Sequence, residues 1–151
     1  MRAVALYPDA ELVAVTWLRD RLAARSEPYA AGVTVGTKLP PEQSPGKYVR
    51  LRRVGGVELH QVADSPRLQA QIWYSTGSPQ DEKNRNDLAQ LVWALLRGIQ
   101  GQDVTIPAWP RPVTCYRVAT FSGPIPVPDP VNSTRTISQL VVEIGMRGRA
   151  L

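Results

Sequence analysis

Apolar and polar residues alternate along Arg67–Tyr74. One side of this stretch would carry Leu68, Ala70 and Ile72, and the other side would carry Arg67, Gln69 and Gln71. A period of two is typical of a β-strand that buries one face and leaves the other polar. We therefore predict a strand here, with its apolar side turned toward the core of the protein.

The longest predicted helix follows this strand. Apolar residues recur every three or four positions from Leu88 to Ile99, as on the buried face of an amphipathic helix. Ser78 is a favourable N-cap, and Pro79 suits the first helical position because its missing N–H would have no helical partner there. The sequence thus predicts a strand, a short turn and a helix that lies back on the sheet.

The same patterns predict the remaining elements. We expect a helix at Pro8–Ala24 and strands at Ala31–Lys38, Lys47–Val54, Val57–Val62, Val113–Phe121 and Arg135–Met146. Gly55-Gly56 is a strong signal for a two-residue hairpin turn. The order is α-β-β-β-β-α-β-β, which predicts an α+β fold with a mostly antiparallel sheet and two main helices packed on one face. The length of 151 residues is that of one domain, residues 1–151.

Three segments are expected to be loops, and all contain prolines. Leu39–Gly46 and Ser122–Thr134 are rich in proline, which favours a stiff and extended path. Gly101–Pro112 holds Trp109 between prolines. Long loops in a compact domain are often functional, although they can also be simple connections.

Composition restricts the function classes only mildly. The chain has 18 basic and 13 acidic residues, and its net charge of +5 is compatible with a nucleic acid partner or with solubility alone. No apolar run approaches the ~20 residues of a membrane span. The N-terminal segment has no long apolar stretch, so we expect neither a signal peptide nor a membrane partner.

Residues suited to catalysis or metal binding are scarce. One histidine and one cysteine cannot supply a structural zinc site, and we expect no metal and no cofactor. His60, Asp64 and Ser65 are close in sequence, but a triad is defined by geometry, and a lone histidine beside a hairpin is more often a surface residue. We therefore expect no catalytic residues and no enzymatic activity.

Two sets of residues are candidates for binding. The polar side of the predicted sheet offers a lumen or interface surface at Arg50, Arg52, Arg67, Gln69, Gln71 and Arg117. The alternative for this surface is an ordinary solvated sheet face. The loops offer candidate contacts at Pro40, Pro41, Pro45, Trp109, Pro126, Pro128 and Asp129.

An ordered series of short motifs extends over nearly the whole chain. It comprises PDAELVAVTWLRDRLA, KLPPEQSP, YVRLRRVGG, DSPRLQAQIWY, DLAQLVWALLRGI and VPDP before the last strand. This series resembles the tail terminator (tail completion) proteins of long-tailed bacteriophages, particularly those that infect actinobacteria. No single motif is diagnostic; the resemblance rests on their order.

The resemblance implies an α+β protein that assembles as a homo-hexameric ring at the head-proximal end of the tail tube. Such a ring stops polymerisation of the major tail tube protein and offers a surface to the head-completion or neck protein. Genomic DNA passes through the lumen without sequence specificity. The protein would belong to the virion tail and would lie in the host cytoplasm during assembly. The family has no catalytic residues, so the candidate residues above come from the sequence pattern alone.

Two other functions remain open from the sequence. The first is a different head–tail connector or neck protein, which would leave tube length unaltered. The second is a small basic nucleic-acid-binding module, whose affinity for free DNA would fall steeply with salt. The basic residues are spread over many elements rather than gathered in one recognition helix, which argues against the second.

Overall fold

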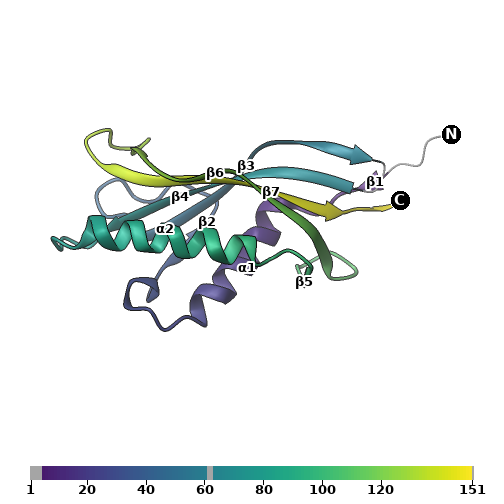
Figure 1. Cartoon of the computed structure of the whole chain (residues 1–151), viewed down its shortest axis with the longest axis horizontal. Helices are drawn as coiled ribbons and strands as arrows, with labels where there is room; N and C mark the ends of the chain where they lie inside the picture. The colour runs from purple at the N-terminus through teal and green to yellow at the C-terminus, as the bar shows by residue number, and fades with distance from the viewer. Residues whose placement is uncertain (1–4, 61–62, 151) are drawn as a thin grey trace.

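A computed structural model describes residues 5–60 and 63–150 of the chain. Within these residues the helices α1 (Ala10–Ala23) and α2 (Asp81–Arg97) lie on the same side of a six-stranded sheet (Figure 1). The sheet consists of β2 (Thr34–Gly36), β3 (Gly46–His60), β4 (Ala63–Ser75), β5 (Gln102–Val104), β6 (Val113–Pro128) and β7 (Thr136–Arg147). This arrangement confirms the predicted fold class, a mostly antiparallel sheet with two main helices packed on one face.

The strands are ordered β2-β3-β4-β7-β6-β5, and each neighbouring pair is antiparallel except β2 and β3. A short 3₁₀ turn (Pro28–Ala30) follows α1. Near the two ends of the described chain, β1 (Ala5–Leu6) pairs with β8 (Arg149–Ala150). The terminal segments therefore meet at one end of the molecule (Figure 1).

The core lies between the helices and the inner face of the sheet. The predicted alternation is confirmed on β4 and on both of its neighbours. The inward side chains with no exposed surface include Val49, Leu51, Leu68, Ala70, Ile72, Leu140, Val142 and Ile144. Burial of each such valine, leucine or isoleucine side chain stabilises the fold by about 1.5–3 kcal/mol before entropy is counted.

The predicted N-cap of α2 is wrong. The helix begins at Asp81, its N-cap position is Gln80, and the Ser78 hydroxyl instead accepts a hydrogen bond from the Gln80 N–H at 3.1 Å. The Asp81 carboxylate accepts the backbone N–H groups of Thr76 at 2.9 Å and Gly77 at 3.1 Å. These bonds close the turn between β4 and α2, which delays the helix by two residues.

The predicted hairpin at Gly55-Gly56 is also wrong, because β3 continues through both glycines to His60. Gly55 pairs with Arg67 and Gly56 with Pro66 on β4, so the antiparallel ladder runs on past the expected turn. The predicted strand Val57–Val62 is therefore the last part of β3 as far as His60, and its last two residues lie outside the described residues.

A β-bulge explains why two glycines stand inside a long strand. The register shifts between Arg53 and Gly55, and Gly56 has a φ of +109°. A Cβ at Gly56 would lie 2.2 Å from the carbonyl oxygen of Ser65 on the neighbouring strand. Only glycine permits this approach, and paired glycines indicate a bulge as readily as a turn.

The second proline-rich segment is mostly strand rather than loop, because β6 extends to Pro128. Its outer side is paired with β5 only at Val113–Cys115. Beyond Cys115, β6 is an edge strand on that side, and an edge tolerates prolines because their missing N–H groups would face solvent. Ser122–Thr134 was thus predicted too long as a loop; the true connection covers residues 129–135.

Candidate functional site

The face of the sheet opposite the two helices carries the predicted polar surface, and we call it the open face. The register of β3, β4, β7 and β6 places on it all six candidates of the sheet. Arg50 lies beside Gln71 and Arg52 beside Gln69, while Arg117 pairs with Gly145 further along β6. The structure therefore brings four of the candidates into one cluster. Arg67, opposite Glu143 on β7, and Arg117 lie further along the face.

Arginine and glutamine side chains pair across β3 and β4. Arg50 donates to Gln71 at 3.3 Å and to the Thr37 carbonyl at 3.1 Å, and Arg52 donates to Gln69 at 2.9 Å. In the described part of the chain no carboxylate forms an ion pair with either arginine. Partial burial and, after it, the charge of Arg52 lower the pKa of Arg50. The amides orient the guanidinium groups and leave their positive charge uncompensated.

Exposed apolar side chains lie on the same face. Phe121 is 63 % exposed and Ile125 is 47 % exposed, both on β6. The Arg67 guanidinium lies 3.8 Å from the centre of the Phe121 ring, and its distance to Glu143 is 3.9 Å. This cation–π contact leaves one side of the ring free. The middle of the open face thus combines apolar and cationic side chains that remain partly exposed to solvent.

The loops at one end of the open face meet over Trp73, which is fully buried. Its indole N–H donates to the Asp129 carboxylate at 2.9 Å, and Arg135 forms an ion pair with the same carboxylate at 3.3 Å. Arg135 also donates to the Glu42 carbonyl in the first proline-rich loop at 3.1 Å. We call Trp73, Asp129, Arg135 and Glu42 the loop junction, because their hydrogen bonds connect two loops that are distant in sequence.

The loop junction changes the role of some predicted loop contacts. Asp129 is 2 % exposed and bonded within the chain, and Pro40 and Pro45 are buried. Pro41, Pro126 and Pro128 are exposed, and Trp109 is half-buried. Only these last four can offer surface to another molecule without a rearrangement of the loops.

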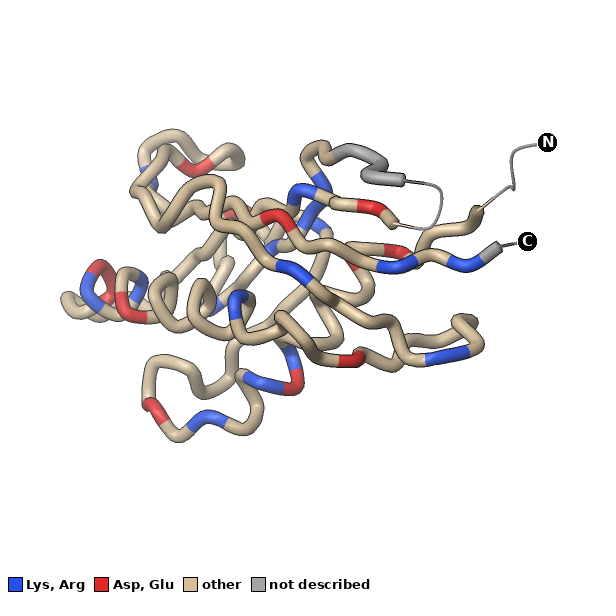
Figure 2. Tube along the Cα trace, turned by 45° about the vertical axis from the view of Figure 1, so that its right-hand side comes forward, with Lys and Arg blue, Asp and Glu red and all other residues tan. Residues whose placement is uncertain are grey.

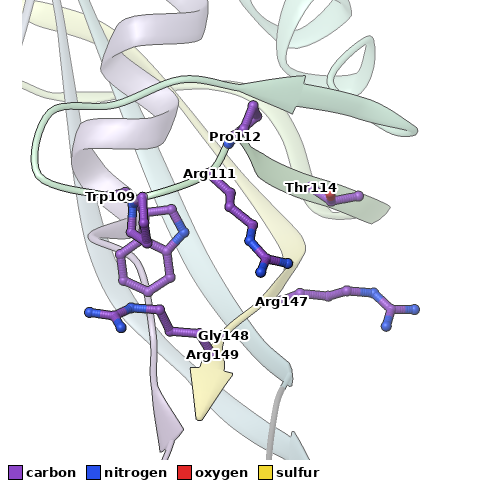
Figure 3. Close-up of a pocket in the computed structure, with 8 residues that line it drawn as sticks. Trp109, Arg111, Pro112, Thr114, Arg147, Gly148 and Arg149 are labelled. Atoms are coloured by element: carbon purple, nitrogen blue, oxygen red, sulfur yellow. The ribbon is translucent and has the colours of Figure 1, made fainter. Parts of the chain in front are cut away.

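A pocket of about 580 Å³ lies at the opposite end of the molecule, where β8 pairs with β1. Figure 3 shows the side chains around it. It is lined by Trp109, Pro110, Arg111, Pro112, Thr114, Arg147, Gly148 and Arg149. The sequence pattern indicated Trp109 but missed the three arginines. Their proximity depends on the pairing of Cys115 with Met146, which sets the start of β6 beside the end of β7.

The residues considered for catalysis do not form a catalytic arrangement where they are described. Asp64 is bound by Arg53 at 2.8 Å, and the buried Ser65 hydroxyl has no hydrogen-bond partner among the described residues. The His60 side chain lies outside the described part. Burial, and then the charge of Asp103, raises the pKa of Cys115 to about 12, so its thiol stays protonated.

The described residues contain neither a metal-binding cluster nor a membrane-spanning helix. Among residues 5–60 and 63–150, no set of three histidine, cysteine or acidic side chains is close enough to hold a metal ion. Over the same residues, no helix has both the length and the apolar character needed to cross a bilayer.

Comparison with known proteins identifies no family for this chain. No protein-family model and no curated protein matches the sequence at a significant level.

Proposed function

We propose that this chain is a structural virion protein of a long-tailed bacteriophage, a tail terminator. In this role it forms a homo-hexameric ring on the head-proximal end of the tail tube and stops further polymerisation of the tube. The ring then offers a joining surface to the neck, and DNA passes through its lumen. The role requires no catalytic residue, cofactor or metal.

The observation that carries this proposal is the mixed surface at the middle of the open face. Phe121 and Ile125 of β6 remain largely exposed, and Phe121 lies against the Arg67 guanidinium. Exposed apolar surface beside polar residues marks sites of contact with other proteins. Aromatic side chains beside arginine are enriched at the centres of protein–protein interfaces. We infer that a second copy of this chain covers Phe121 and Ile125 in the ring.

The edges of the sheet favour contact through faces and loops. The edge strands β2 and β5 have only three residues each, and the free edge of β6 carries Pro124, Pro126 and Pro128. Short strands and prolines oppose strand-to-strand addition. A closed ring needs two different complementary patches on each protomer, and the open face can supply one of them.

Native mass spectrometry over a concentration series tests the ring. We expect a discrete hexamer, either for the protein alone or after addition of purified tail tubes. A second measurement tests the biological role: the length of tubes polymerised from the major tail tube protein should stop increasing when this chain is added.

Two results would overturn the proposal. A protein that stays monomeric both alone and with tubes is not a ring-forming terminator. A ring that binds neck or portal components yet leaves tube growth unchanged would identify another head–tail connector.

A further inference from the structure

We propose that the pocket formed by Trp109, Arg111, Arg147 and Arg149 binds the phosphate backbone of a nucleic acid. The pocket lies at the terminal end of the molecule, away from the loop junction. Figure 2 shows basic segments on the C-terminal strand and on the loop before β6, both at this end of the molecule. The inference does not rest on the ring, because it concerns a site within one chain.

The three arginines have no acidic partner among the described residues. None of the described residues that line the pocket is acidic. Within residues 5–60 and 63–150, the side chains of Arg111, Arg147 and Arg149 form no ion pair and no hydrogen bond. Three guanidinium groups around one pocket repel one another, and an anion relieves this repulsion. The planar, five-donor geometry of arginine matches phosphate oxygens in particular.

Aromatic and apolar groups form part of the wall. Arg149 lies 5.4 Å from the centre of the Trp109 ring, and Arg147 lies 5.6 Å from that of Tyr116. These contacts hold the two arginines over rings while their side-chain N–H groups remain free to bind. Figure 3 shows Arg149 beside the Trp109 ring. Pro110 and Pro112 add apolar surface beside the indole. A sugar or a base can pack on such a surface, whereas an isolated phosphate ion gains nothing from it.

Further arginines extend the positive charge along the open face. Arg147 ends β7, and Arg117 pairs with Gly145 two residues earlier on the same strand. Arg67 pairs with Glu143, two residues further along, and adds less positive charge because its guanidinium lies 3.9 Å from the Glu143 carboxylate. An extended polyanion with regularly spaced charges can follow such a series, which favours a nucleic acid over a single carboxylate or a short acidic peptide.

The test is fluorescence anisotropy of a labelled DNA oligonucleotide, single-stranded and duplex, titrated with the full chain. The variant Arg111→Gln/Arg147→Gln/Arg149→Gln should lose at least about tenfold in affinity at low salt. The slope of log affinity against log salt should fall by about 1 for each arginine removed. The Arg111 side chain forms no hydrogen bond or ion pair with the described residues, so Arg111→Gln should leave the fold intact. This single variant should lower the slope of log affinity against log salt by about 1.

A matched control has the same charge change on the helical side. Arg21 and Arg97 also lie over tryptophan rings, and Arg25 is an exposed arginine after α1. The variant Arg21→Gln/Arg25→Gln/Arg97→Gln should keep more than about a third of the affinity. Circular dichroism should show that both triple variants are folded, and native mass spectrometry should show unchanged oligomeric state.

Three outcomes would overturn the proposal. The pocket variants could bind DNA as the unchanged protein does. The control variant could lose as much affinity as the pocket variant, which would mean that only net charge matters. Poly-glutamate or inorganic phosphate could displace the DNA at equal charge concentration, which would mean that the pocket accepts any anion and does not recognise a nucleic acid backbone.

Discussion

The hydroxyl groups of two buried serines in the sheet have different surroundings. Ser138 is 3 % exposed, and its hydroxyl accepts a hydrogen bond from the Arg85 guanidinium at 3.0 Å. Ser65 is 1 % exposed, and its hydroxyl has no partner among the described residues. A buried polar group without a partner loses its hydration and gains nothing in return.

The two serines should respond differently to replacement by alanine. Ser138→Ala leaves a charged donor without its acceptor and should lower the free energy of unfolding by about 1–3 kcal/mol. Ser65→Ala removes an unsatisfied hydroxyl and should be neutral or stabilising by up to about 1 kcal/mol. Urea denaturation of both variants provides the comparison. Equal losses would show that the Ser65 hydroxyl has a partner in solution.

At the scale of elements, the loop junction holds the two proline-rich connections in place. Asp129→Ala should lower the free energy of unfolding by about 3–5 kcal/mol, because it leaves the Trp73 indole and the Arg135 guanidinium without their shared acceptor. Thermal and urea unfolding measure this loss, and limited proteolysis should show cleavage within residues 39–45.

The control for this prediction is Asp20→Ala, which removes an exposed carboxylate from α1. Its effect should stay within about 0.5 kcal/mol. A similar small effect for Asp129→Ala would mean that the two loops are held by other contacts and that the carboxylate only fills space.

Elements were predictable from the sequence where a local pattern alone determines them. The alternation of Leu68, Ala70 and Ile72 is enough to place a strand and its buried side. The folded sheet buries the same three side chains against the core, so the local pattern and the tertiary packing agree. Gly55-Gly56 was misinterpreted because a hairpin and a bulge have the same local signature. The difference is the approach of Ser65 from β4, which no local pattern contains.

The candidate surfaces show the same limit at the scale of the whole molecule. Arg50 and Arg52 could be placed on one face from the strand period alone. Arg111 and Arg149 could not be joined into a pocket, because their proximity depends on which strands pair and in which register. Asp129 was expected at the surface of a loop, and only the folded chain shows that it is bonded to Trp73.

Ring assembly can be tested through Phe121, whose exposed ring is the largest apolar group of the open face. Its removal from a buried contact between protomers should weaken each contact by about 1.5–3 kcal/mol, or roughly 10-fold to 100-fold in affinity. Phe121→Ala should therefore shift ring formation to higher concentration in native mass spectrometry, with or without tail tubes. The exposed ring contributes little to the fold of the monomer, so the stability should remain within about 0.5 kcal/mol.

Leu39→Ala provides the matched control, because Leu39 is 47 % exposed but lies in the first proline-rich loop. If Phe121 lies between protomers, only its own variant changes the concentration at which the ring forms. Equal shifts for both variants would mean that general surface hydrophobicity drives association. An unchanged ring in Phe121→Ala would place the contact elsewhere, and the exposed prolines Pro41, Pro126 and Pro128 would then be the next positions to replace. The concentration series thus separates a specific interface on the open face from non-specific association.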